Sequence, residues 1–488
     1  MTGSEDQSSE ESDPSSSPLR ARAQRVLLGN WTGSSTVPSH GLYPHQWSWD
    51  SAFIAIGLRH LSVERAQTEL ETLFAAQWGD GRVPHIVFNP AVPLGLYFPG
   101  PDFWRSSTTG AAAGAPERME TSGIVQPPVH ALACWLVHQA DPRLSARRGF
   151  LARLYPKLVA WHRYLTGSRD LGGGGLVSVV HPWEPGMDNS PCWDAPLSRV
   201  KPAPPGTFRR ADLDHGAACD RPTDLDYGRY VRLATDYRDS GYEDGAFSPD
   251  FAVEDPGVNA LLIASECALA GIAAAIGSDP GVHRARAARL TEALVRRLWD
   301  PETEMFLCRD LRDGADGGLV PERSAAGLLP LIVPVLPREI AAALMRTACG
   351  EHFGLGSSVR LVPSYDLLGH AFDASRYWRG PAWFNVNWLL ERALRQRGAL
   401  RRADALRNQA LTCALSSGFA EYVDPRTGRA RGSRNFSWTA ALALDLLAAA
   451  EKDHRAARTA DAEVRGLDGA RLSGNPTGSG SAQRETAG

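Results

Sequence analysis

Two acidic side chains stand out because aromatic and polar residues surround them. Asp188 lies in the turn-like segment HPWEPGMDNSPCWD (181–194), between two tryptophans, and Glu421 lies in FAEYVDPRTGRARGSRNFSWT (419–439), which is rich in Gly and Arg. An aromatic wall that partly excludes water raises the pKa of a carboxyl group, so Asp188 suits an acid that stays protonated near neutral pH. Glu421 lies where an ionised carboxylate could activate water. Cleavage of a glycosidic bond uses such a pair.

Two further clusters have the same character, HQWSWDSAF (45–53) and YWRGPAWFNVNW (377–388), and most of the fourteen tryptophans lie in or beside the four clusters. Carbohydrates present apolar C–H faces and polar edges, which aromatic platforms beside carboxylates, amides and arginine match. Each carboxylate also has a structural alternative, with Asp188 as a turn or N-cap residue and Glu421 as a surface carboxylate.

Helical periodicity dominates the rest of the sequence. Leu290, Leu294 and Leu298 recur at every fourth position, and segments 257–275 and 438–450 are apolar nearly all round, as shielded inner helices would be. The patterns predict about twelve helices, near 51–60, 64–78, 128–140, 150–166, 226–240, 257–276, 283–299, 323–332, 336–349, 382–396, 401–416 and 437–451. Helices in consecutive hairpins indicate an all-α fold, an (α/α)6 barrel with inner and outer rings and long loops that form the pocket.

The two ends of the chain differ in composition from the middle. Residues 1–22 and 455–488 are rich in Ser, Gly, Glu, Ala and Arg, and they lack the apolar surface to offset the entropy of ordering, so we expect disordered tails. Between them no linker stands out, and we expect a single barrel domain over residues 23–454. The formal net charge of −3 favours neither nucleic acid nor an anionic membrane as partner. The oligomeric state is left open, a homo-oligomer included.

The cysteines and the N-terminal segment bear on the compartment. The seven cysteines are scattered and include no Cys-x-x-Cys pair, which favours reduced thiols over a disulfide framework or a structural zinc site. The first residues are acidic and Ser-rich, unlike a secretory signal, and no later segment is expected to span a membrane. We expect a cytoplasmic protein. Neither a metal-ligand spacing nor a nucleotide-binding Gly loop is apparent, so no cofactor is predicted.

The motifs taken together resemble one enzyme family. QWSWDSAF, GxVPHI (81–86), WEPGMDNSP, YWRGPAWFNVNW and EYxDPxTG…FSWTAA occur in this order, over roughly residues 28 to 452. The combination is similar to glycoside hydrolase family 63 and its relatives, (α/α)6-barrel inverting enzymes, and within it to bacterial mannosylglycerate and glucosylglycerate hydrolases. The resemblance implies hydrolysis of a small glycoside, most simply glucosylglycerate or mannosylglycerate, to the free hexose and glycerate.

The resemblance also implies roles for particular residues. Asp188 matches the general acid of the family and Glu421 its general base, which implies inversion by an attacking water. The early Trp-x-Trp-Asp motif, which helps to enclose the sugar, corresponds to Trp47, Trp49 and Asp50. Further pocket residues match at Trp183, Gly186, Tyr377, Trp378, Arg379, Trp383 and Trp438.

A glycerate aglycone carries a carboxylate, which requires Arg or several hydroxyl and amide donors. The residues that resemble the glycerate-contacting set of the family are Tyr43, Tyr97, Gln126, Arg221 and Tyr227. Segment 95–104 resembles a mobile loop over the pocket. His85 is a candidate for binding a sugar hydroxyl, with a satisfied structural histidine as the alternative. The alternative for Arg221 is a salt bridge with Asp224 or Asp226.

Three other functions compete with this interpretation. An α-glucosidase or trehalase-like enzyme would use the same carboxylates on a neutral disaccharide. A sugar epimerase on the same barrel would rely on paired histidines for proton transfer, but the thirteen histidines do not cluster with the carboxylate motifs, apart from His85 and His181. A non-catalytic sugar-binding module would not need both carboxylates.

Overall fold

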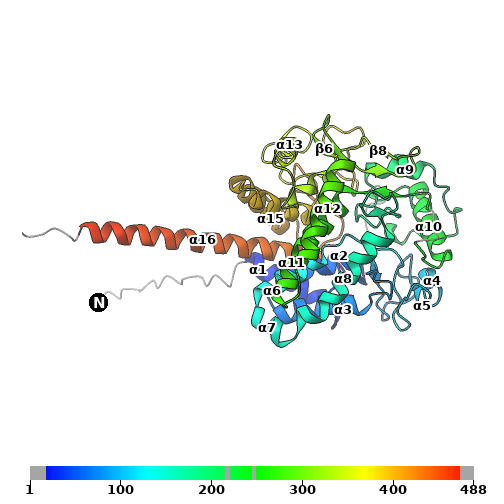
Figure 1. The fold of residues 1–488 in the computed structure, drawn as a ribbon, viewed down its shortest axis with the longest axis horizontal. Helices are drawn as coiled ribbons and strands as arrows, with labels where there is room; N and C mark the ends of the chain where they lie inside the picture. The colour runs from blue at the N-terminus through cyan, green and yellow to red at the C-terminus, as the bar shows by residue number, and fades with distance from the viewer. Residues whose placement is uncertain (1–17, 215–219, 245–248, 473–488) are drawn as a thin grey trace, which may run out of the picture. The chain divides into compact units, whose positions relative to one another are not determined.

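An inner ring of helices forms the centre of the fold in the computed structural model, which describes residues 18–214, 220–244 and 249–472 (Figure 1). The inner elements are α2 (Ser48–Leu58), α6 (His130–Ala140), α11 (Pro256–Ala275), the 3-10 helix η5 (Ala325–Ile332), α14 (Phe384–Gln396) and the first part of α16 (Ser437–Leu472). From α2 to α14, each packs against the next. The start of α16 closes the ring, since Asp445 accepts hydrogen bonds from Arg59, directly after α2, and from Trp388 on α14.

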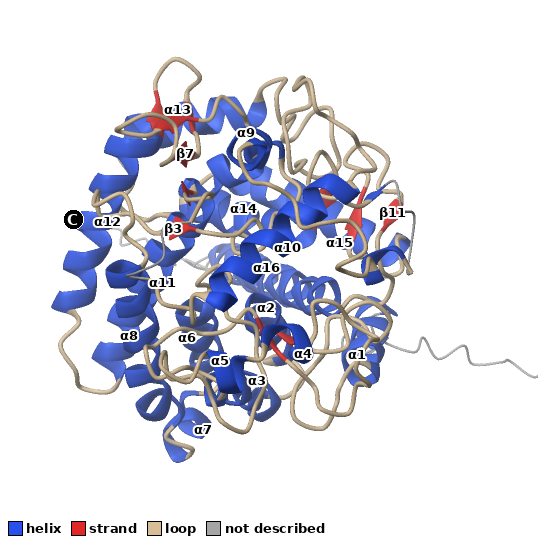
Figure 2. Ribbon diagram, turned by 90° about the vertical axis from the view of Figure 1, so that its right-hand side faces the viewer, coloured by secondary structure: helices blue, strands red, loops and turns tan. Residues whose placement is uncertain are grey.

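A second set of helices covers the ring from outside: α1 (Pro18–Gly29), α3 (Val63–Ala75), α8 (Phe150–Ser168), α12 (Gly281–Leu298), α13 (Arg338–Cys349) and α15 (Leu400–Ser416). Five of them pack on the inner elements in the pairs α2–α3, α6–α8, α11–α12, η5–α13 and α14–α15. Helix α1 lies beside α3, where Arg65 donates to the Leu27 carbonyl. Figure 2 shows α2, α6, α11 and α14 around the centre with α3, α8 and α12 outside them. The predicted (α/α)6 barrel is confirmed.

The structure departs from the sequence-based expectation at three elements of the barrel, although the predicted helix 226–240 is confirmed as a helix. The predicted helix 226–240 is α10 (Asp224–Asp239), which lies among the loops rather than in either ring. Helix α1, and not α10, is the sixth helix of the outer set. Residues 18–22, at its start, were expected in a disordered tail. The predicted helix 323–332 is the 3-10 helix η5, in which Pro330 lacks an amide donor and Gly327 packs on the Phe306 carbonyl.

The chain divides into two units, residues 1–445 and 446–488. The second unit is the continuation of α16, which is helical to Leu472, so residues 455–472 are helical where a disordered tail was expected. Residues 1–17 and 473–488, the remainder of the two predicted tails, lie outside the described residues. The assignment of 23–454 to one domain stays a prediction.

Helix α11 corrects another expectation. The helix has 20 residues, and its most apolar 18-residue stretch has a mean hydropathy of 1.8. It is the one helix among the described residues that is long and apolar enough to cross a membrane. From the sequence, no segment was expected to have this length and apolarity. However, 78% of its apolar stretch is buried inside the protein, because α6, α8, α12 and η5 pack around it. Burial by neighbouring helices accounts for its composition.

Short strands and single turns link the helices, and the strands of the described residues have two residues each, in antiparallel pairs. The sheets are β1 (Gln46–Trp47) with β2 (Ile86–Val87); β9 (Ala382–Trp383), β10 (Tyr422–Val423) and β11 (Ala430–Arg431); β3 (Ser178–Val179), β4 (Val253–Glu254), β7 (Arg309–Asp310) and β8 (Gly318–Leu319); and β5 (Trp299–Asp300) with β6 (Met305–Phe306). The short helices are α4 (Pro101–Trp104), α5 (Ser106–Thr109), α7 (Pro142–Arg147), η2 (Pro191–Trp193), α9 (Asp194–Ser198) and η3 (Ala211–Leu213). Strands β1, β4 and β9 lead directly into inner helices, so the sheets that contain them lie at the N-terminal end of the ring.

The contact between α2 and α16 leaves no room for a side chain at Gly57. A Cβ atom there would lie 2.3 Å from the Ala441 backbone. We expect Gly57→Ala to lower the free energy of unfolding by about 1–3 kcal/mol, because the two backbones must separate. Gly167→Ala is the control: position 167, near the end of α8, has open space around it, so alanine should be neutral or slightly stabilising. Urea unfolding of both variants measures the difference, and equal midpoints would contradict the expected close contact.

Candidate active site

A pocket opens at the N-terminal end of the inner ring. It has a volume of about 530 Å³ and is lined by Pro38, Tyr43, Trp47, Trp49, Asp50, His85, Tyr97, Gln126, Trp183, Gly186, Asp188, Tyr377, Trp378, Trp383, Glu421, Phe436 and Trp438. The lining comes from the first turns of α2 and α16 and from the loops and short strands that connect the helices at this end. Because every inner helix begins at this end, residues distant in sequence meet here. We call this space the inner pocket.

A second pocket adjoins the first. Its volume is about 610 Å³, and its lining is Leu42, Tyr43, Leu96, Tyr97, Phe98, Pro99, Trp183, Asp188, Ala211, Asp212, Arg221, Pro222, Tyr227 and Tyr377. We call it the outer pocket. Asp188, Trp183, Tyr43, Tyr97 and Tyr377 line both. A ligand that fills both pockets would therefore pass beside the Asp188 carboxyl.

Glu421 immediately precedes β10 and is almost fully buried, which excludes the alternative of a surface carboxylate. Tyr43 donates a hydrogen bond of 2.8 Å to Oε1, and the Ser433 amide donates one of 3.0 Å to Oε2. Gly432 passes so close that a Cβ there would lie 2.5 Å from Oε2. Burial raises the pKa of Glu421, while Arg221 and these donors oppose the rise. The hydrogen bonds thus hold the carboxylate in one orientation.

Asp188 lies in a turn whose backbone is constrained from two sides. Tyr230 donates a hydrogen bond of 2.9 Å to the Asp188 carbonyl. Two residues earlier, Gly186 has φ = +69° and packs so closely on Trp49 that a Cβ would lie 2.4 Å from its ring, so only glycine fits. Burial raises the pKa of Asp188 to about 7, against the lowering effect of Arg221. Asp188 is therefore a carboxyl group that can be protonated near neutral pH.

Aromatic rings form most of the wall of the inner pocket. Trp378 and Trp383 are stacked, with ring centroids 3.9 Å apart and planes 3° apart, and Trp438 meets Trp49 edge to face at 5.5 Å. Asp50, in the first turn of α2, adds a third carboxyl group, and burial together with Glu421 raises its pKa well above the usual range. A protonated Asp50 would donate a hydrogen bond to a ligand hydroxyl.

The outer pocket contains the guanidinium of Arg221. Its Nη1 donates to the Tyr43 hydroxyl at 3.2 Å, and the group lies 4.7 Å from the centre of the Tyr377 ring. The predicted alternative, a salt bridge with Asp224 or Asp226, is wrong. Asp224 pairs with Arg210 and Asp226 with Arg229 instead.

The two histidines near the pockets are poor proton carriers at neutral pH. His85 lines the inner pocket, parallel to the Trp183 ring, and burial lowers its pKa to about 3. His181, whose ring lies 4.4 Å from that of Trp183, has its pKa lowered to about 3 for the same reason. Proton transfer by paired histidines, which an epimerase needs, is therefore disfavoured. Among the residues that the structure describes, no group of three or more His, Cys, Asp or Glu could hold a metal ion.

The structure brings together the predicted site residues with one exception. Arg379 lines neither pocket. It forms two hydrogen bonds with Asp194 and donates a third, of 3.2 Å, to the Asn189 carbonyl. Its side chain faces away because the side chain of the preceding residue, Trp378, already forms the wall. The backbone amide of Trp378 donates a hydrogen bond of 2.8 Å to the side-chain oxygen of Asn189, which holds it there. The prediction of Arg379 as a substrate contact is not supported by this geometry.

Sequence reasoning missed several lining residues: Pro38 and Phe436 in the inner pocket, and Leu42, Leu96, Phe98, Pro99, Ala211, Asp212 and Pro222 in the outer pocket. A signal existed for those in segment 95–104, which was expected to cover the pocket. Tyr227 donates to the Phe98 carbonyl at 3.2 Å, which ties this segment to α10. Ala211 and Asp212 belong to a long polar loop without any local pattern that points to a site.

Two carboxyl groups between tryptophan rings at this end of the barrel are typical of the active site of a glycoside hydrolase. The comparisons with known proteins agree with this class of enzyme. The chain belongs to the mannosylglycerate hydrolase MGH1-like glycoside hydrolase family, whose domain model matches residues 43–439. It is similar to the mannosylglycerate hydrolase of Rubrobacter radiotolerans, with 40% identity over 90% of this chain and 98% of that protein. The glucosylglycerate hydrolase of Mycolicibacterium hassiacum is 39% identical over 89% and 99%.

A solved structure is similar over the same region. The family 63 mannosylglycerate hydrolase from Thermus thermophilus, in complex with Tris and D-glycerate, has a TM-score of 0.79 and 40% identity over 88% of this chain and 99% of that chain. The predicted resemblance to glycoside hydrolase family 63 is confirmed. The protein is thus an enzyme that hydrolyses glycosidic bonds.

Proposed function

We propose that this enzyme hydrolyses the α-glycosidic bond of glucosylglycerate or mannosylglycerate with inversion. The observation that carries the proposal is the position of Asp188 at the junction of two pockets, with Glu421 in the inner one and Arg221 in the outer one. The hexose occupies the inner pocket and the glycerate the outer pocket. The names of the relatives, and the D-glycerate in the related structure, support this substrate class.

In this mechanism Asp188 protonates the glycosidic oxygen while Glu421 removes a proton from an attacking water on the opposite face of the sugar. The raised pKa of Asp188, about 7, keeps it available as an acid near neutral pH. Tyr43 and the Ser433 amide hold the Glu421 carboxylate, so that its position is prepared before substrate binds. The stacked tryptophans provide apolar faces for the sugar ring.

The test is to incubate the purified enzyme with glucosylglycerate, mannosylglycerate and neutral α-glucosides such as trehalose, and to follow the released anomer by proton NMR. First release of the β-anomer from a glycerate glycoside supports inversion and the charged aglycone together. Release from neutral glucosides alone would retain the two carboxylates and contradict the glycerate pocket. Cytoplasmic location and oligomeric state stay predictions.

Arg221 is expected to provide selectivity for the charged aglycone. Glucosylglycerate and the neutral glucosylglycerol differ in one carboxylate, so the pair isolates the charge. Arg221→Ala should lower kcat/KM for glucosylglycerate by about 10–100-fold more than for glucosylglycerol, the value of a charge-assisted hydrogen bond. Steady-state kinetics on both compounds measures the difference. Arg221→Lys, which keeps the charge, should recover part of it, and equal losses on both compounds would exclude this role.

A further inference from the structure

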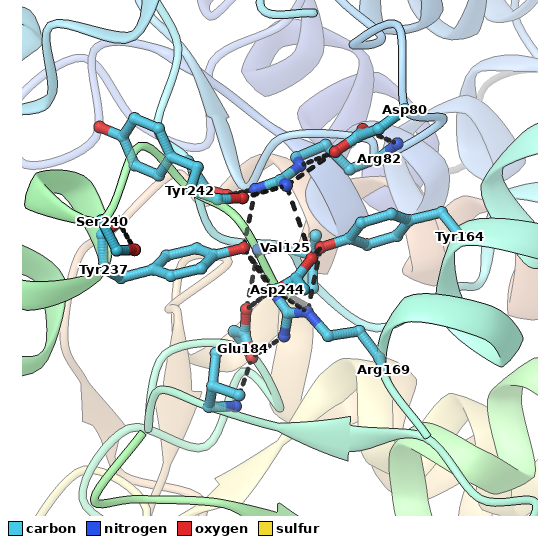
Figure 3. A network of polar contacts seen from close by, with 12 residues as sticks. Asp80, Arg82, Val125, Tyr164, Arg169, Glu184, Tyr237, Ser240, Tyr242 and Asp244 are labelled. Atoms are coloured by element: carbon cyan, nitrogen blue, oxygen red, sulfur yellow. Dashed lines mark hydrogen bonds and ion pairs between the residues drawn. The ribbon is translucent and has the colours of Figure 1, made fainter. Parts of the chain in front are cut away.

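A network of polar and charged side chains surrounds Arg169 and Arg82 (Figure 3). Arg169 and Glu184, both with 0% side-chain exposure, form two parallel hydrogen bonds of 2.8 and 2.9 Å. The Arg169 Nε group lies 2.9 Å from a carboxylate oxygen of Asp244. Asp244 also accepts hydrogen bonds from Tyr164 and Tyr237, at 2.6 and 2.7 Å. The guanidinium of Arg169 is thus held by two carboxylates.

A second arginine, Arg82, extends the network. It bonds to Asp80 through Nε at 2.8 Å, and its Nη1 donates to the Tyr237 hydroxyl at 2.8 Å and to the Gly123 carbonyl at 2.9 Å. Its Nη2 donates to the Tyr242 carbonyl at 2.7 Å. Arg82 therefore joins the segment that follows α3 to the segment that follows α10, and Figure 3 shows the two arginines on either side of the Tyr237 hydroxyl.

Glu184 connects this network to the catalytic turn. Besides Arg169, its carboxylate accepts hydrogen bonds from the Val180 amide at 2.7 Å and from the Val125 amide at 3.3 Å. Its neighbour Trp183 lines both pockets, and Asp188 lies four residues after Glu184. Next to Val125, the Gln126 side chain accepts from the Trp49 amide at 3.1 Å. One buried carboxylate thus ties together two segments of the pocket wall, and Gln126 connects them to the start of α2.

We propose that Arg169 and Glu184 form a positioning pair that orients the turn carrying the general acid, an inference that rests on the proposed function. The turn between Glu184 and Asp188 contains Gly186, which packs directly on Trp49. A shift at Glu184 is therefore transmitted to Asp188 through a short, tightly packed segment. A buried ion pair is weak evidence for stability, because apolar side chains of similar volume are often at least as stabilising. The two parallel hydrogen bonds from the planar guanidinium of Arg169 to Glu184 fix the orientation of the turn.

The test separates positioning of the acid from general damage by varying the leaving group. An oxygen-linked glycoside needs protonation by Asp188, whereas fluoride departs from a glycosyl fluoride almost without it. In Glu184→Gln, kcat for the glycerate glycoside should fall at least about 10-fold, while kcat for the α-glycosyl fluoride and both KM values should change by less than about 3-fold. Arg169→Met should behave like Glu184→Gln, and Arg169→Lys should recover part of the loss. Equal losses on both substrates, or no loss on either, would overturn the proposal.

Glu266→Gln is the matched control. Glu266 is another fully buried carboxylate, which accepts from His162, His283 and Arg286 on the outer side of α11. Its variant should lower stability and leave the ratio of the two activities unchanged. Arg169→Lys keeps the positive charge and remains informative if Glu184→Gln does not fold. If the wild-type enzyme cleaves the fluoride but no glycerate glycoside, the proposed substrate fails. The positioning role is then measured on whichever oxygen-linked glycoside is cleaved.

Discussion

Asp188→Asn is expected to reduce kcat on the glycerate glycoside by about 10²–10⁴-fold, with little change in KM. Asparagine has nearly the same shape, so the turn held by Tyr230 should persist, but its amide cannot donate a proton to the departing oxygen. Steady-state kinetics measures the loss. The same variant should retain most of its activity on an α-glycosyl fluoride, because fluoride leaves without an acid. A comparable loss on the fluoride would contradict the assignment of Asp188 as general acid.

The pH profile provides an independent measurement of the same assignment. The acid must be protonated to act, and burial raises the pKa of Asp188 to about 7. Activity of the wild-type enzyme should therefore fall as the pH rises through about 7, and in Asp188→Asn this alkaline limb should disappear. Since Asp188 and Glu421 influence each other, the limbs report apparent values of the pair. A wild-type profile that stays flat to well above that pKa would contradict the proposed acid.

Glu421→Gln is expected to cause a loss of similar size, about 10²–10⁴-fold in kcat, because the attacking water loses its base. Glutamine has nearly the same shape and keeps one acceptor oxygen for Tyr43, although it loses the acceptor for the Ser433 amide, so most of the pocket wall should remain in place. Azide needs no deprotonation, so it should restore turnover of an α-glycosyl fluoride in this variant and yield the β-glycosyl azide, detectable by NMR. Azide should not do so in Asp188→Asn.

Glu391→Gln is the control for this variant. Glu391 is a buried carboxylate on α14 that pairs with Arg395 and lines neither pocket. Its variant should keep wild-type turnover. A retained activity in Glu421→Gln, or an α-configured azide product, would show that another group activates the water or that the reaction proceeds with retention.

Local sequence was sufficient for the elements of the fold. Periodicity located the long helices from α2 to α15 to within a few residues and the start of α16, because burial of one face, or of all faces in α11, leaves its pattern in any stretch long enough to form several turns. It failed where burial is not periodic. Helix α1 follows directly on a low-complexity tail and was not predicted, whereas α10 was predicted as a helix but lies among the loops rather than in the ring, a position that its amphipathic pattern does not reveal.

The candidate site was predictable as a set of residues and not as an arrangement. Aromatic clusters around Asp188 and Glu421 are visible in the sequence because the chemistry of a sugar ring dictates the residue types. Arg379 was misassigned for the same reason. It lies within such a cluster, and nothing local indicates that the backbone of its neighbour Trp378 is held by Asn189 from a segment 189 residues away.

The sequence alone thus determined the helical elements, the family and the two carboxylates. Only the tertiary structure decided that the two carboxylates, far apart in the chain, open onto one pocket, because closure of the ring by α16 brings the starts of all inner helices to one end. It also sets the direction of their pKa shifts, since burial raises both pKa values and Arg221 opposes the rise, and both effects act through space. The support of Asp188 by Arg169 through Glu184 likewise depends on contacts that no local pattern encodes.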